Sequence, residues 1–141
     1  MEQTERFKYK LINYSNALEG FNDLLKVNLS EYAGVVLDGL KNGQIQKFEY
    51  CTELTWKIIK SFLQNIHMLE LPTPKLALKA FYTNNFVDEK VYELLINMLE
   101  DRNKLSHIYN EKDFGKIHIK LRDYFNVMRS VDGIIKNYIS E

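Results

Sequence analysis

The sequence predicts an all-α fold, an up-and-down bundle of four long helices with one or two short ones, in a single domain over residues 1–141. Apolar residues recur every three or four positions through most of the chain, which is the period of one buried helix face. No segment shows the strict apolar–polar alternation of a half-buried strand. A chain of 141 residues is the usual size of one domain, and such helices bury their apolar stripes together in an antiparallel bundle.

The composition indicates a globular protein without a broad basic surface. Apolar residues make up 45%, and 19 basic side chains balance 19 acidic ones. This balance argues against a protein held along nucleic acid by many phosphate contacts, but it leaves room for a compact site that grips one or two phosphates. Cys51 is the only cysteine, so we expect no intrachain disulfide and a reducing compartment. Without a signal-peptide core after Met1 or an apolar run near ~20 residues, we expect a soluble, cytoplasmic protein with no membrane partner.

The first predicted helix runs from Thr4, a plausible N-cap, to about Val27. Its apolar residues are spaced alternately by four and three positions, which places them on one stripe. A stripe sustained over three heptads is the packing edge of an intrachain bundle or of a dimer, and the bundle is the commoner arrangement. The stripe consists of Phe7, Leu11, Tyr14, Leu18, Phe21 and Leu25.

The next segment is predicted to contain a short helix and then a long one. Ser30 can cap a helix over residues 31–40, and the glycine pair Gly39 and Gly43 predicts a break after it. A long helix should follow from about Gln44 to Met68. The residues expected to face inward from that helix are Phe48, Cys51 or Thr52, Thr55, Ile58 or Ile59, Phe62 and Ile66.

Three further helices complete the prediction. The prolines of residues 72–74 end the long helix and start a shorter one, because proline suits a first helical turn and not an interior. The amide pair at residues 84–85 favours a turn, and Asp88 is a good N-cap for the next helix. The last helix is predicted to start near residues 112–113 and to run to about Tyr138.

The helix that begins after Asp88 leads into residues 101–109, with the sequence DRNKLSHIY. No other stretch gathers so many groups that can hold a phosphate or transfer a proton. In a straight helix, residues five apart point about 140° away from each other, so Arg102 and His107 do not share a face. One phosphate can meet both side chains only if the helix loosens, if the arginine reaches around, or if two subunits converge about a two-fold axis.

The chemistry of this stretch suits RNA cleavage without a metal. His107 can serve as base or acid at neutral pH, and Arg102 offers a fork of donors to phosphate oxygens. Asn103 or Ser106 could orient the phosphate or the imidazole. The three histidines and the single cysteine lack the spacing of a metal site, so we expect none. Basic residues are also favoured at helix C-termini by the macrodipole, and the pattern alone favours this simpler explanation.

Two blocks of residues carry a family resemblance. Residues 98–103 read MLEDRN and residues 106–111 read SHIYNE, while residues 46–50 read QKFEY and residues 53–57 read ELTWK. Both blocks resemble the HEPN family, and within it the small proteins first described as nucleotidyltransferase substrate-binding subunits. The second block is similar to the family's FEY…ELAWK helix, with threonine where alanine is usual. The resemblance covers about residues 5 to 138.

The resemblance implies specific roles for the first block. The family hallmark is an arginine with a polar neighbour, then a histidine after four intervening residues, and a tyrosine two positions later. Arg102, Asn103, His107 and Tyr109 fill these places. The resemblance implies a dimer in which Arg102 and His107 of both subunits line an RNase cleft, supported by Asn103, while the supporting role of Ser106 rests on its chemistry alone.

The resemblance also implies a partner. Many relatives are regarded as toxins paired with a minimal nucleotidyltransferase antitoxin, which transfers AMP from ATP to the tyrosine. ATP and magnesium would then belong to the partner, and we expect no cofactor in this chain. An adenylyl phosphate on Tyr109, on the helical face of Arg102, would pair with that guanidinium and occupy the place of the substrate phosphate. Without the resemblance, Tyr109 is better interpreted as a phenol that closes the end of the bundle.

Two alternatives stay open. The chain could be a non-catalytic subunit that presents a substrate to a separate nucleotidyltransferase, or a helical scaffold with an accidental motif. Trp56 is interpreted as core or interface packing rather than as a platform for a base. Glu49 and Glu53 are interpreted as solvated carboxylates, and His67 and His118 as structural residues.

Overall fold

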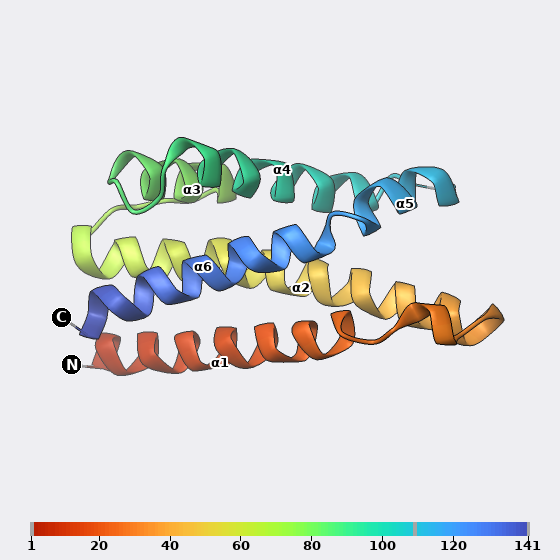
Figure 1. The fold of residues 1–141 in the computed structure, drawn as a ribbon. Coiled ribbons are helices and arrows are strands. Elements are labelled where there is room, and N and C mark those ends of the chain that lie inside the picture. Colours follow the sequence, from red (N-terminus) through yellow and green to blue (C-terminus); the bar gives the residue numbers. More distant parts are fainter. Residues whose placement is uncertain (1, 109, 141) are drawn as a thin grey trace.

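A computed structural model describes residues 2–108 and 110–140, and within them the chain forms a helical bundle without strands (Figure 1). The four long helices run up and down, as predicted, and three short helical segments join them. The helices are α1 (Glu2–Leu25), the 3₁₀ turn η1 (Leu29–Glu31), α2 (Gly34–His67), α3 (Pro74–Thr83), α4 (Glu89–Leu105), α5 (Glu111–His118) and α6 (Leu121–Ser140). The all-α prediction is therefore confirmed, while the dimer stays a prediction.

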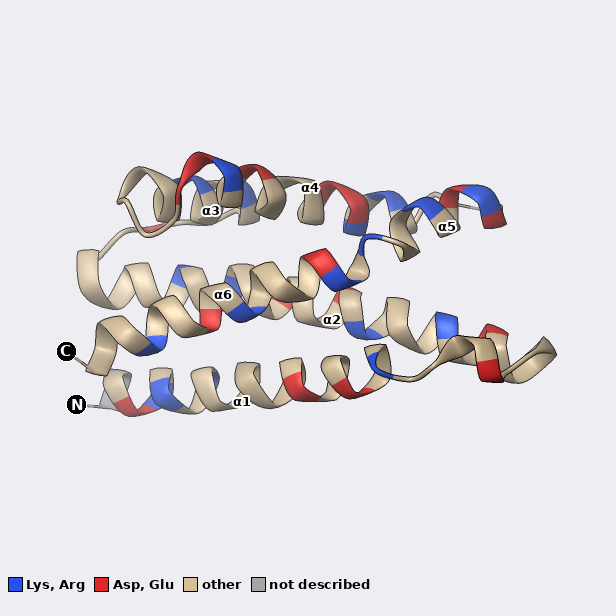
Figure 2. Ribbon diagram, viewed as in Figure 1, with Lys and Arg blue, Asp and Glu red and all other residues tan. Residues whose placement is uncertain are grey.

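Helix α2 is the centre of the bundle, since it contacts α1, α3, α4 and α6. The chain ends lie at one end of the molecule, and the connection from α4 to α5 lies at the other (Figure 1). Basic and acidic residues alternate along the helices rather than gathering on one face of this view (Figure 2). Among the described helices, none is long and apolar enough to cross a membrane.

The apolar stripe predicted for α1 is the inner face of that helix. Its residues from Phe7 to Phe21 are buried, and Leu25 packs against the same core. Tyr14 ties three helices together, because its hydroxyl donates to the Met128 carbonyl at 3.0 Å and lies 2.8 Å from Thr55 Oγ1. Burial raises the pKa of Tyr14. This phenol therefore stays neutral and acts as a structural link.

The predicted break at Gly39 and Gly43 was wrong, because α2 runs without interruption from Gly34 to His67. Gly34, with φ of 58°, supplies the turn into the helix, while Ser30 lies in the preceding 3₁₀ segment. Gly43 packs closely on α1, where an added Cβ would lie 3.2 Å from Leu24 Cδ2. Tertiary contact at this point outweighs the weak helix propensity of glycine.

Replacing Gly39 with alanine is expected to stabilise the protein by about 0.5–1 kcal/mol, because a helical glycine loses more backbone entropy on folding than alanine. An added Cβ at Gly39 would meet nothing within 4 Å. The measurement is the urea unfolding midpoint. Gly43→Ala is the matched control, and its gain in stability should be smaller because the Leu24 side chain must move to accommodate the added Cβ. A destabilised Gly39→Ala variant would contradict the continuous helix.

The last helix is divided, which corrects the prediction of one helix from residues 112–113 to Tyr138. Helix α5 begins at Glu111, and the side chain of Asn110 caps it by accepting from the Asp113 N–H at 2.9 Å. The chain then turns through Ile119 and Lys120, where the Lys120 N–H bonds to the Ile117 carbonyl at 2.9 Å. After this turn α6 returns along the bundle towards the chain ends (Figure 1), while α5 and the first turns of α2 line the same hollow.

The remaining helix ends follow the expected capping chemistry. Thr73 accepts from the Leu76 N–H at 3.2 Å, with Pro74 as the first residue of α3. Asp88 accepts from the Val91 N–H at 2.9 Å and caps α4, as predicted. These caps fix where α4 begins, and hence where its last turn presents Arg102.

Candidate functional site

The stretch that the sequence singled out lies at the C-terminal end of α4. Arg102 and Asn103 belong to its last turn, the helix ends at Leu105, and Ser106 and His107 form the turn that follows. The His107 N–H bonds to the Lys104 carbonyl at 2.9 Å, and the Ser106 hydroxyl donates to the Asn103 carbonyl at 2.8 Å. The last turn of α4 therefore contains Arg102, and His107 lies in the turn directly after the helix end.

Arg102 forms an ion pair with Glu53, a residue expected from the sequence to be a solvated carboxylate. Glu53 on α2 places Oε1 3.4 Å from Arg102 Nε, and the two side chains are 31% and 36% exposed. The Arg102 Nε atom itself is buried and has no well-aligned hydrogen bond among the described residues. The other Glu53 oxygen accepts from Trp56 Nε1 at 3.3 Å. The pair thus orients the guanidinium, and no described residue hydrogen-bonds to its other two nitrogens, which can donate to an anion.

Asp101, the residue before Arg102, anchors the end of α4 on α6. Its carboxylate is buried, accepts a short hydrogen bond from the Tyr124 hydroxyl, and accepts from Lys120 Nζ at 3.2 Å. Burial, and next the hydrogen bond to Asp101, raises the pKa of Tyr124, so this phenol is a neutral donor. The spacing could have revealed Asp101, because it continues the inward-facing stripe of Leu94 and Met98 with a charged residue.

The other predicted site residues lie at the surface. Asn103, Ser106 and His107 are exposed, and in the described part of the chain the His107 imidazole has no hydrogen-bond partner. Tyr109 lies outside the described residues. The structure therefore brings Arg102, Asn103, Ser106 and His107 to one helix end, and it fixes only the arginine through another side chain.

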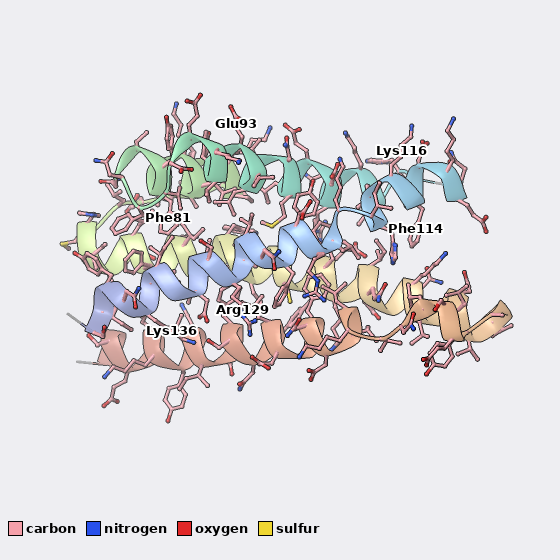
Figure 3. All side chains as sticks on the ribbon, viewed as in Figure 1. Phe81, Glu93, Phe114, Lys116, Arg129 and Lys136 are labelled. Atoms are coloured by element: carbon pink, nitrogen blue, oxygen red, sulfur yellow. The ribbon has the colours of Figure 1, made fainter. Side chains whose placement is uncertain are left out.

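A groove lies beside this helix end, between the first turns of α2 and helix α5. It has a volume of about 230 Å³ and is lined by Asp38, Asn42, Ile108, Asn110, Glu111 and Phe114. Figure 3 shows Phe114 on the side of α5 that faces α2. A second hollow of about 340 Å³ continues along the same two helices to His118. The cleft between α2 and α5 is therefore lined by Ile108 and Asn110, which follow His107, while Arg102, Asn103, Ser106 and His107 do not line it.

His118 closes this cleft and has a defined tautomer. Gln44 donates from Nε2 to the Leu24 carbonyl at 3.0 Å, so its Oε1 faces His118 Nε2 at 2.6 Å. An amide oxygen only accepts, and His118 therefore carries its proton on Nε2. Burial, and to a lesser degree the charge of Lys41, lowers the pKa of His118 below its ordinary value of 6.5. His118 is a structural residue, in agreement with the sequence interpretation.

The lowered pKa of His118 predicts a pH-dependent stability. As the pH falls below about 6.5, the unfolded chain takes up a proton on His118 before the folded protein does, so the free energy of unfolding decreases. Above that pH His118 is neutral in both the folded and the unfolded state, and the protein keeps its full stability. Urea unfolding at pH 7.5 and 5.5 measures the difference. His118→Gln should flatten the dependence, and the exposed His67→Gln should leave it unchanged.

The described residues hold no group of three or more His, Cys, Asp or Glu side chains placed to bind a metal ion. Cys51, buried on α2, donates weakly to the Ala17 carbonyl at 3.6 Å, and burial raises the pKa of its thiol to about 12. A thiol in that environment is not a nucleophile. Neither observation bears on Arg102 and His107, which stay the candidate site residues.

Comparisons with known proteins place this geometry in context. The family model described as "nucleotidyltransferase substrate binding protein like" matches residues 9–136. The crystal structure of ttk003001694 from Thermus thermophilus is similar at a TM-score of 0.76 and 27% identity, covering 86% of this chain and 98% of that one. A mutant of the toxin–antitoxin pair MntA–HpeT gives 0.74 and 10%, covering 93% and 97%, which shows a shared fold. No curated protein matches significantly.

Proposed function

The chain belongs to the family of nucleotidyltransferase substrate binding-like proteins, and from this premise we propose that it is a HEPN-type toxin. In this proposal it is a metal-independent endoribonuclease whose site is completed by a second subunit. A cognate minimal nucleotidyltransferase neutralises it through Tyr109. The observation that carries the proposal is the end of α4 between Arg102 and His107, which leaves an oriented guanidinium and an exposed imidazole at one helix terminus.

The proposed reaction uses the RNA's own 2′-hydroxyl. That oxygen attacks the adjacent phosphorus, the bond from phosphorus to the 5′-oxygen breaks, and the products end in a 2′,3′-cyclic phosphate and a 5′-hydroxyl. One imidazole takes the proton of the 2′-hydroxyl and another gives a proton to the leaving oxygen, which two copies of His107 supply in a symmetric dimer. The free donors of Arg102 stabilise the charge of the transition state.

The proposed partner acts on Tyr109, and this assignment rests on the resemblance. An AMP group there adds a negative phosphate and a bulky nucleoside close in sequence to Arg102, so it competes with the RNA phosphate. The fold shared with a structure of the toxin–antitoxin pair MntA–HpeT supports this class of partnership. The ATP and magnesium of the transfer belong to the nucleotidyltransferase.

The alternative function is a non-catalytic subunit that presents a substrate to a nucleotidyltransferase. Two observations favour it: the description of the matching family, and the Glu53 carboxylate that neutralises Arg102 in the single subunit. In that case the helix end recognises an anionic group without cleaving it.

RNA cleavage by the purified protein in the presence of EDTA tests the proposal. We expect cleavage with cyclic-phosphate ends, because no step requires a metal. A protein that binds the nucleotidyltransferase but leaves RNA intact would establish the alternative instead.

The partnership has a separate test on Tyr109. Co-expression with the nucleotidyltransferase should add one or more AMP units to the intact mass, since ATP is present in the cell. Tyr109→Phe should abolish the addition, and Tyr138→Phe, an exposed tyrosine at the opposite end of the bundle, is the control. Addition of AMP to the Tyr109→Phe variant would refute the assignment.

A further inference from the structure

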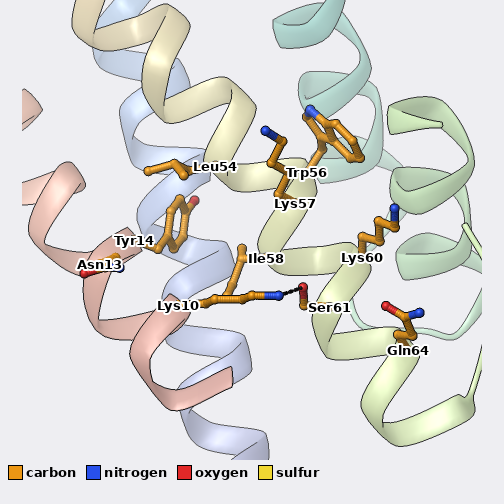
Figure 4. Close-up of a pocket in the computed structure, with 10 residues that line it drawn as sticks. All are labelled: Lys10, Asn13, Tyr14, Leu54, Trp56, Lys57, Ile58, Lys60, Ser61 and Gln64. Atoms are coloured by element: carbon orange, nitrogen blue, oxygen red, sulfur yellow. Dashed lines mark hydrogen bonds between the residues drawn. The ribbon is translucent and has the colours of Figure 1, made fainter. Parts of the chain in front are cut away.

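A second concave surface lies on the outer face of α1 and α2, away from the cleft beside α5 (Figure 4). It has a volume of about 430 Å³, and among the described residues no carboxylate lines it. The apolar side chains Leu54 and Ile58 form part of its lining, and three lysines, an indole and smaller polar side chains also line it. The lysines, the indole and two of these polar side chains are Lys10, Lys57 and Lys60, Trp56, and Ser61 and Gln64.

The three lysines of this groove are not neutralised. Lys10 Nζ donates to Ser61 Oγ at 3.2 Å, and Lys57 and Lys60 each place Nζ 5.9 Å from the centre of the Trp56 ring. None of them pairs with a carboxylate in the described part of the chain, which is also true of eight other lysines, but these three line one hollow together. In a chain of zero net charge, this gathering of free ammonium groups indicates a surface for an anion.

The groove is linked to the Arg102 site through Glu53, although neither Glu53 nor Arg102 lines it. Trp56 donates to the same Glu53 carboxylate that holds Arg102. Positions 53, 56, 57, 60 and 64 follow each other at helical spacing on one stripe of α2, over about 16 Å at 1.5 Å per residue. At its far end the groove joins a hollow of about 400 Å³ that adds Arg6 as well as one carboxylate, Glu70. An anion that extends away from Arg102 thus meets the indole first and the lysines next.

We propose that this groove binds the single-stranded RNA next to the cleaved phosphate, with Lys10, Lys57 and Lys60 on backbone phosphates and a base against Trp56. The inference rests on the proposed function, because RNA is the substrate named there. An aromatic side chain among cations is the usual platform for single-stranded nucleic acid, on which stacking tolerates any base. Lysine is depleted at protein–protein interfaces, so the composition favours a polyanion over a protein partner.

The test uses the full chain with His107→Ala and a single-stranded RNA that is 2′-O-methylated throughout, so that nothing is cleaved. Trp56 is the only tryptophan, and we expect RNA to quench its fluorescence as a base stacks on it. Replacing both Lys57 and Lys60 with alanine should weaken binding at least about tenfold. It should also lower the slope of log affinity against log salt by about 1.4, which is two phosphate contacts.

The matched control replaces Lys8 and Lys90 with alanine, since both are exposed and lie outside this groove. It should change neither the affinity nor the salt slope. Alanine is the best helix former, so both double variants should stay folded. Unchanged RNA binding by the Lys57 and Lys60 variant overturns the inference. So does a loss of self-association or of nucleotidyltransferase binding in that variant with RNA binding intact, which would make the groove a protein interface.

The two proposals fail in distinguishable ways. If the unmodified protein cleaves RNA and the groove variant binds and cleaves equally well, the groove is wrong and the ribonuclease stands. If the protein binds RNA through the groove, with quenching and the expected salt slope, but never cleaves, the groove stands and the ribonuclease is wrong.

Discussion

Under the proposed function, replacing His107 with alanine is expected to lower the rate of RNA cleavage by about 10²–10⁴-fold, the usual contribution of a positioned acid or base. The imidazole is exposed at the end of α4 and makes no hydrogen bond to another described residue, so its removal should not unfold the protein. The rate of cleavage of a labelled RNA in EDTA is the measurement. In cells, induced expression of the unmodified chain without its partner should arrest growth, and the variant should relieve the arrest.

The control for this result is His67→Ala, which removes an exposed imidazole that lies near Phe86, with ring centres 6.2 Å apart. It should keep both cleavage and toxicity. Equal toxicity of the His107→Ala variant and the unmodified chain would exclude His107 as a catalytic residue. Retained cleavage with a shifted pH profile would instead indicate that another group supplies the proton transfer.

Replacing Asp101 with alanine is expected to cost about 3 kcal/mol of stability. The Tyr124 hydroxyl, on a side chain only 2% exposed, would lose its acceptor, and an unsatisfied buried donor costs about 1–3 kcal/mol. The contact with Lys120 adds less, because that lysine is 49% exposed and its ion pair is screened by solvent. Urea unfolding followed by circular dichroism measures the change.

Asp101→Asn is the matched variant, because its amide oxygen can still accept from Tyr124. It should lose only the ion pairs to Lys120 and Lys104, roughly 1 kcal/mol together. Under the proposed function it should also keep more activity than Asp101→Ala, since the end of α4 stays on α6 and Arg102 keeps its place. A change in stability below about 0.5 kcal/mol for Asp101→Ala would show that the anchor is unimportant.

The sequence predicts the helices correctly where the spacing of apolar residues alone determines which helix face is buried. The stripe of α1 and the inward face of α2 follow directly from the spacing of residues such as Phe7 and Phe48, both of which are buried. The predicted helix break at Gly39 and Gly43 was wrong, because helix propensity depends only on the local sequence. It does not include the tertiary contact between Leu24 and Gly43. The prediction also failed at the division of the last helix, because the apolar period continues from Ile117 to Leu121, both buried, while the chain changes direction between them.

The candidate site could be predicted only in part, because some of its features are local in sequence and others depend on tertiary contacts. The order of residues from Arg102 to His107 is local, and the position of this stretch at the end of the helix that begins after Asp88 follows from it. The partners of this stretch are not local. Glu53 meets Arg102, and Tyr124 meets Asp101, only once α2, α4 and α6 are packed in register. Sequence spacing contains no information on that register.

Both ends of the described chain lie together, at the pole of the bundle opposite the α4–α5 connection (Figure 1). Polypeptide joined to either end therefore leaves the bundle on the side away from Arg102 and His107. This geometry suits a module that can be inserted into a larger polypeptide or tethered to a surface, because adjacent termini disturb a host chain little. In such a fusion the motif would still project outward, open to a second copy of the module.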